Sequence, residues 1–141
     1  MKKSALIGIF LFLVLLSGFG IFETGIVGAT GENVTVMSAT LPSARSLISC
    51  AENSATYKIY CFGGWINPAT MTDQIVEYDP GTNNLIIKSS VLNPPRGEHS
   101  CAENSATHKI YCFGGLNINP TNYIGQIVEY NPANDSTIIK S

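Results

Sequence analysis

The chain has 141 residues and carries 8 Lys and Arg against 10 Asp and Glu, which gives a formal net charge of −2. Without residues 1–29, which we interpret as a leader, six basic residues stand against nine acidic ones and no basic cluster is left. Phosphate binding needs clustered Lys and Arg, so nucleic acid is not an expected partner.

The first residues have the order of a secretory leader. Lys2 and Lys3 precede an uncharged, apolar stretch from residue 5 to residue 22, which predicts a hydrophobic leader helix. Small residues at positions 27 and 29 resemble a signal-peptidase site. The stretch is also nearly long enough to span a bilayer, so residues 1–29 are either a cleaved signal peptide or an N-terminal membrane anchor. Both alternatives predict a secreted or cell-surface protein, with membrane contact only through residues 5–22 if the leader is retained.

The rest of the chain holds two copies of one repeat. The segment from Cys50 to Gly64 returns from Cys101 to Gly115 with a single change, from Tyr57 to His108. Residues 74–80 and 86–89 return as 126–132 and 138–141, and residues 33–36 resemble residues 84–87. The last segment of the repeat is therefore present three times, and a fixed period of this kind indicates a repeat architecture.

Each repeat predicts four short strands. In the first repeat these are residues 46–51, 58–62, 74–78 and 85–88. The second strand is rich in β-branched and aromatic residues and stops at Gly63 and Gly64, and the third ends in a turn sequence at residues 79–81. Short strands at regular spacing, without helical periodicity, predict an all-β, antiparallel architecture.

These residues resemble the kelch repeat. The matching features are Arg45 and Arg96 after a Leu-Pro-type connection, the pairs Gly63-Gly64 and Gly114-Gly115, and Tyr78 and Tyr130 in Tyr-Asp-Pro and Tyr-Asn-Pro. The resemblance covers essentially residues 33–141. It implies two four-stranded propeller blades at 43–89 and 94–141, preceded by a segment at 30–42 whose residues 33–36 would serve as an extra N-terminal strand.

Two departures from the kelch pattern affect what the resemblance implies. Kelch blades usually place a Trp seven residues after the repeated Tyr, where this chain has Leu85 and Thr137. Closed kelch propellers also have more than two blades. We therefore expect an incomplete or truncated propeller, whose exposed blade edges favour self-association.

The four cysteines form the same pair in each repeat, Cys50 with Cys61 and Cys101 with Cys112. A hairpin centred between residues 55 and 56 would place Cys50 opposite Cys61, at a separation that suits a disulfide. A shift of one residue would put the sulfurs on opposite faces and leave buried free thiols, so both alternatives are open. A metal site is not expected, because the spacing is not Cys-x-x-Cys and the two histidines do not recur as matching ligands.

The other polar residues favour structural roles. His108 falls in a hairpin loop and His99 on a partly buried strand position, where the first repeat has Ile48. Glu77 and Glu129 recur in both repeats, which favours a scaffold role over a single catalytic site. No nucleophile elbow, phosphate loop or cofactor motif is present in the sequence, so we predict neither an enzyme nor a cofactor.

The repeats differ most in the loop after each Gly-Gly pair, at residues 65–73 and 116–125. Strands that alternate in direction place these loops on the same face as the connections that carry the two arginines. We predict a binding face there, formed by the amphipathic residues Trp65, Met71, Tyr123, Arg45 and Arg96. The alternative for Trp65 is that it packs locally and braces its loop.

The predicted function is a noncatalytic, exported interaction module that binds a protein or carbohydrate ligand, as the kelch resemblance implies for many members. Two alternatives stay open. Some kelch propellers are enzymes that act on sugars, as oxidases or epimerases, and this chain could be a fragment of one. It could also be a nonfunctional, truncated gene product.

Overall fold

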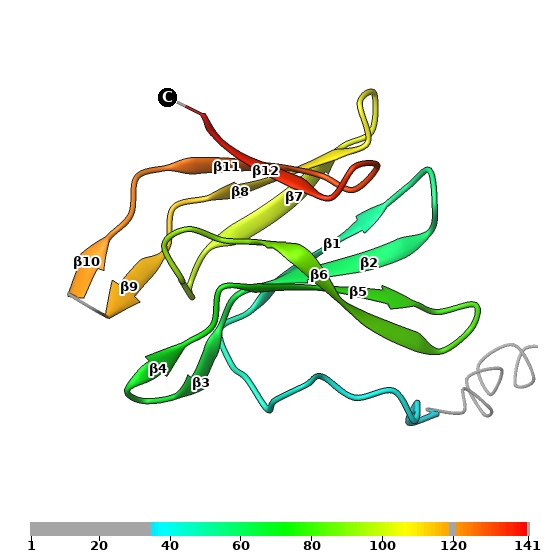
Figure 1. The fold of residues 1–141 in the computed structure, drawn as a ribbon, viewed down its shortest axis with the longest axis horizontal. Coiled ribbons are helices and arrows are strands. Elements are labelled where there is room, and N and C mark those ends of the chain that lie inside the picture. The colour runs from blue at the N-terminus through cyan, green and yellow to red at the C-terminus, as the bar shows by residue number, and fades with distance from the viewer. Residues whose placement is uncertain (1–34, 119–120, 141) are drawn as a thin grey trace, which may run out of the picture. The chain divides into compact units, whose positions relative to one another are not determined.

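The computed structural model describes residues 35–118 and 121–140 (Figure 1). All of the regular structure in this part of the chain is β, which confirms the predicted fold class at the level of antiparallel sheets. Within the same ranges the chain contains no helix with the length and apolarity needed to cross a membrane. The predicted leader at residues 1–29 lies outside the described residues.

Each repeat folds into one four-stranded antiparallel sheet. The first sheet has the order β1 (Ser49–Asn53), β2 (Lys58–Phe62), β5 (Gln74–Asp79) and β6 (Asn84–Val91). The second has the matching order β7 (Ser100–Asn104), β8 (Lys109–Phe113), β11 (Ile127–Asn131) and β12 (Ser136–Lys140). In each sheet the four strands follow one another in chain order, as the four predicted strands of each repeat require.

Both segments predicted as loops contain a further small hairpin. β3 (Trp65–Asn67) pairs with β4 (Thr70–Met71), and β9 (Leu116–Ile118) pairs with β10 (Thr121–Tyr123). The first strand begins at Ser49 and not at residue 46, because Leu47 has a positive φ of 52° that interrupts an extended strand. Of residues 46–48, Ser46 alone forms a β-bridge, an isolated one to Trp65. The hairpins of the two repeats lie at the same end of the sheets (Figure 1).

The Gly-Gly pairs end the second strand of each sheet for a steric reason. Gly63 and Gly64 have φ values of 58° and 101°, a region that side chains rarely tolerate. A Cβ on Gly63 would lie 2.3 Å from the backbone oxygen of Arg96, and the amide of Gly64 donates to that same oxygen at 2.9 Å. The connection between the repeats therefore passes directly over the glycine pair, and no larger residue fits.

The hairpin register brings the two cysteines of each repeat together. Cys50 pairs with Cys61 across β1 and β2, and Cys101 pairs with Cys112 across β7 and β8. Both pairs form disulfides in the structure. The turns that fix this register place Tyr57 and His108 at φ values of 57° and 54°.

The two sheets pack face to face, with β1 next to β7 (Figure 1). Tyr60 and Phe62 of the first sheet point at Tyr130 of the second, with ring centroids 5.5 and 5.6 Å apart. The buried core between them consists of Tyr60, Phe62, Ile75, Leu92, Ile110, Cys112, Val128 and Tyr130. One sheet alone would expose its share of these side chains, so the repeats stabilise each other.

Residues 37–41 lie against the first sheet, on the face that points away from the second. The Asn83 amide donates to the hydroxyl of Ser38 at 2.7 Å. The predicted strand at residues 33–36 is wrong for its described part, because Thr35 and Val36 belong to no strand and Val36 is 91% exposed. The first two residues of that predicted strand, 33 and 34, lie outside the described residues.

Candidate functional site

A groove lies between the two hairpins that the sequence comparison marks as divergent. Strand β4 of the first hairpin contacts strand β9 of the second, so the two hairpins lie side by side. The groove is lined by Ala69, Thr70, Met71, Pro95, Asn117 and Ile118. The wall contributed by Pro95 comes from the connection between the repeats, which brings three separate segments to one site.

Of the predicted binding residues, Met71 and Tyr123 are placed where a ligand can reach them. Met71 is half-buried in the wall of the groove. Tyr123 ends β10 and is 84% exposed. A groove with apolar side chains in its walls and an exposed aromatic side chain are both typical of recognition surfaces.

Trp65 braces the structure. Its backbone exchanges hydrogen bonds with Ser46, and its side chain shares a cross-strand position with Met71. A Cβ on Gly97 would lie 2.4 Å from Trp65 Cδ1, so the indole packs directly against the connection that leads into the second repeat. We therefore assign Trp65 to the support of the groove, the alternative that the sequence left open.

The two arginines make matching internal bonds. Arg45 donates to the carbonyl of Gly63 at 3.4 Å and to the side chain of Gln74 at 2.9 Å. Arg96 donates to the carbonyl of Gly114 at 3.1 Å and to Gln126 at 3.0 Å, and it is fully buried. Their guanidinium groups hold the end of the second strand to the start of the third, so we assign them to the framework and not to the binding face.

The repeated glutamates are the centres of two charged clusters. Glu129 accepts hydrogen bonds from Lys109, Lys140 and the hydroxyl of Tyr111, and these bonds, that of Lys109 foremost, lower its pKa to about 2. Glu77 is likewise bonded to two lysines, Lys58 and Lys88. Burial alone would raise the pKa of Glu77, but the two lysines more than offset it and the net pKa is lowered. Carboxylates held ionised in this way suit a structural role in both sheets.

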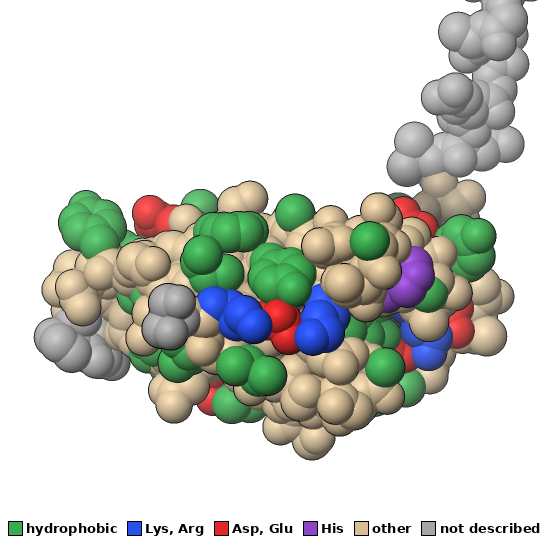
Figure 2. Space-filling model, turned by 90° about the horizontal axis from the view of Figure 1, so that it is seen from above, with side chains coloured by type: hydrophobic (Ala, Val, Ile, Leu, Met, Phe, Trp, Pro, Cys, Tyr) green, Lys and Arg blue, Asp and Glu red, His purple; other side chains and the backbone are tan. Residues whose placement is uncertain are grey.

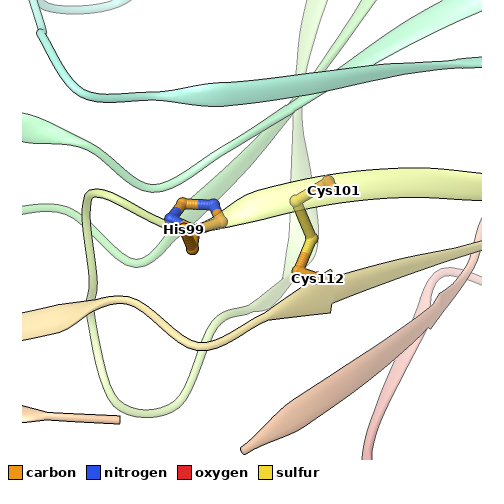
Figure 3. A group of neighbouring side chains, drawn as sticks. All are labelled: His99, Cys101 and Cys112. Carbon is orange, nitrogen blue, oxygen red and sulfur yellow. A yellow bond between two sulfur atoms is a disulfide. The ribbon is translucent and has the colours of Figure 1, made fainter. Parts of the chain in front are cut away.

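His99 lies beside the disulfide of the second repeat (Figure 3). One of its ring nitrogens and the sulfurs of Cys101 and Cys112 lie within 4.8 Å of one another. Metal binding by cysteine needs a thiolate, and both sulfurs are joined to each other, so the oxidised cluster offers only the imidazole. Burial, together with the positive charge of Arg96, lowers the pKa of His99 to about 4. Neither ring nitrogen has a hydrogen-bond partner among the described residues.

The chain matches no model of a known protein family, and it matches no curated protein. The kelch resemblance therefore depends on the repeated residues themselves. Sequence comparison of the two repeats predicted the loops that form the groove, and one of the named residues, Met71, lines it. It did not name Ile118, although Ile118 lies within the divergent loop at residues 116–125. It missed Pro95, which lies outside both divergent loops, in the connection between the repeats.

Proposed function

We propose that this chain is an exported, noncatalytic interaction module made of two kelch-type propeller blades. The groove between the hairpins β3–β4 and β9–β10 takes its ligand, a protein or a carbohydrate. The observation that carries the proposal is the contrast between the sheets, which repeat nearly unchanged, and the hairpins, which diverge and lie side by side. A binding surface made by repeats varies where it contacts its ligand, and its framework does not need to vary.

The antiparallel order of four strands in each repeat supports the blade assignment. So do the internal bonds of Arg45 and Arg96 to the Gly-Gly segments, because these are the residues on which the kelch resemblance rests. The lysine-bonded glutamates support a noncatalytic role, since both are engaged in equivalent clusters within the scaffold.

The proposal is tested by binding of the exported protein to an immobilised panel of glycans and a panel of extracellular protein domains. We expect Met71→Asp and Tyr123→Ala to weaken the binding that is found by about 10-fold or more each. Tyr57→His is the matched control, because Tyr57 is 73% exposed at the opposite end of the sheet and the second repeat has His108 in its place. Equal binding by all three variants would refute the groove as the binding site.

A further inference from the structure

The two sheets contact each other through non-equivalent faces, so the residues that the first sheet buries are not the counterparts of those that the second sheet buries. The first sheet contributes the face with Asn53, Tyr60 and Phe62, whose exposed fractions are 2%, 2% and 0%. The second sheet contributes its opposite face, with Ile110 and Tyr130 fully buried. The contact is therefore of the head-to-tail kind, which leaves one unused copy of each face on the molecule.

The unused face of the second sheet carries the same residues as the buried face of the first. Phe113 corresponds to Phe62 and is 48% exposed, where Phe62 is fully buried. Tyr111, which corresponds to Tyr60, is half-buried, and Asn104, which corresponds to Asn53, is exposed. This sheet is uppermost in Figure 1, and the view from above in Figure 2 shows hydrophobic side chains gathered around a line of charged ones.

The unused face of the first sheet contains an apolar hollow. It is lined by Met37, Ala39, Leu41, Ile59, Cys61, Tyr78 and Leu85. On the second sheet, the corresponding residues Ile110, Cys112 and Tyr130 form the surface that receives Tyr60 and Phe62. The hollow on the first sheet therefore corresponds to the surface of the second sheet that Tyr60 and Phe62 occupy.

Residues 37–41 complete this correspondence. They take the position on the first sheet that residues 88–92 take on the second. Ser38 accepts a hydrogen bond from Asn83, as Ser89 bonds the equivalent Asp135 in the second repeat. Leu92, the counterpart of Leu41, is fully buried between the two sheets. Residues 37–41 therefore form part of the hollow and do not fill it.

We propose that the occupant of the hollow is a second copy of this chain, which inserts Tyr111 and Phe113. The contact between copies reproduces the contact that the two repeats make within one copy. In the internal contact, the Asn53 amide donates to the carbonyl of His108 at 2.8 Å and Ser54 donates to Glu103 at 2.8 Å. Between copies, Asn104 and Ser105 of the inserting copy supply the same donors, and the Tyr57 carbonyl and the Glu52 carboxylate of the receiving copy supply the acceptors.

Such a contact is heterologous, so each copy has one inserting face and one receiving face. Copies then add head to tail into a ring or a chain and do not stop at a symmetric pair. The inference rests on the sheets and not on the ligand groove. The groove variants Met71→Asp and Tyr123→Ala are expected to leave association unchanged, and the two proposals can fail separately.

Sedimentation of the full exported chain over a range of concentrations, up to roughly millimolar, tests the proposal. The wild-type protein is expected to form species larger than a dimer. Phe113→Asp removes the inserting face and Leu85→Asp removes the receiving face, and each variant alone is expected to lose at least about 10-fold in association. An equal mixture of the two variants is expected to form a 1:1 dimer and nothing larger, because one intact face of each kind is left.

Ile138→Asp is the matched control. Ile138 is 53% exposed on the same face as Phe113, but its counterpart Ile86 stays 46% exposed in the internal contact. The control is therefore expected to associate like the wild type. Circular dichroism checks that each variant is folded, and Met37→Asp replaces Leu85→Asp if the latter unfolds, because Met37 is 43% exposed in the hollow.

Three results would overturn the proposal. The first is a wild-type protein that stays monomeric at every concentration. The second is normal association of folded receiving-face variants, which would indicate a symmetric contact through Phe113. The third is a mixture of the two variants that does not form the 1:1 dimer.

Discussion

The two repeats share nearly the same residues but not the same surroundings. Phe62 and Phe113 lie in identical segments, yet Phe62 is fully buried and Phe113 is 48% exposed. The reverse holds for the opposite faces, where Tyr130 is fully buried and Tyr78 is half-buried. In a repeat structure, the burial of a residue is thus decided by the neighbouring repeat and not by its own segment.

The largest expected effect comes from the phenylalanines. Phe62→Ala is expected to lower the free energy of unfolding by about 3–5 kcal/mol, because it leaves a cavity against Tyr130 in the core. Phe113→Ala is expected to cost about 1 kcal/mol or less. Urea denaturation at low protein concentration measures both, and equal losses would contradict the assignment of buried and free faces.

The disulfides give the next comparison. Replacing both cysteines by Ala in either repeat opens the same loop and is expected to cost about 3 kcal/mol through chain entropy. Cys112 is 1% exposed where its counterpart Cys61 is half-buried, and Cys101 is half-buried where its counterpart Cys50 is exposed. The second repeat is therefore expected to lose about 1 kcal/mol more through lost packing. Denaturation of the two double variants, each folded by circular dichroism, measures the difference. A larger loss in the first repeat would contradict it.

Much of the fold could be predicted because the two copies of the repeat can be aligned with each other, which separates the shared strands from the divergent loops. The hairpin β1–β2 and its Gly-Gly stop follow from β-branched residues and from glycines that need a positive φ. The hairpins β3–β4 and β9–β10 could not be predicted, because their short segments, such as Ile66-Asn67-Pro68, lack the alternation of a strand.

The site was only partly predictable, for a physical reason. Arg96 has the residue type of a binding surface, but its partners are the carbonyl of Gly114 and the side chain of Gln126. Backbone acceptors occur in every segment, so the sequence carries no signal for such a bond. Tyr123 is 84% exposed, and its place on a binding face stays a prediction from its residue type.

His99 gives a pH-dependent difference between the repeats. Its pKa is about 4 in the folded chain against 6.5 as the ordinary value, so between these pH values the unfolded chain binds a proton that the folded chain does not. Its contribution therefore destabilises the fold progressively as the pH falls from 6.5 to 4, by at most about 3 kcal/mol. His99→Ile, which copies Ile48 of the first repeat, is expected to remove this loss.

Thermal denaturation between pH 7 and pH 4 measures the effect as the difference between wild type and variant. The difference is expected to grow as the pH falls through this window. Ile48→Val is the matched control, because it changes the corresponding position of the first repeat without adding or removing a titratable group, and its difference from wild type is expected not to vary with pH. A constant difference for the His99 variant across the window would show that His99 is not kept neutral by burial.

The smallest expected effect concerns the lysines that bond the repeated glutamates. The side chain of Lys88 is 17% exposed at Glu77, and that of Lys140 is 47% exposed at Glu129, with N–O distances of 3.0 and 3.1 Å. Ion pairs lose strength as solvent and salt screen them, so Lys88→Met is expected to cost about 1 kcal/mol and Lys140→Met about 0.5 kcal/mol or less. Each glutamate keeps its second lysine, which prevents an unpaired buried charge in either variant. Denaturation in low and high salt measures both costs. The same cost and the same salt dependence for the two variants would contradict this expectation. They would show that the ion pair of Lys140 is shielded from solvent as well as that of Lys88, despite the greater exposure of Lys140.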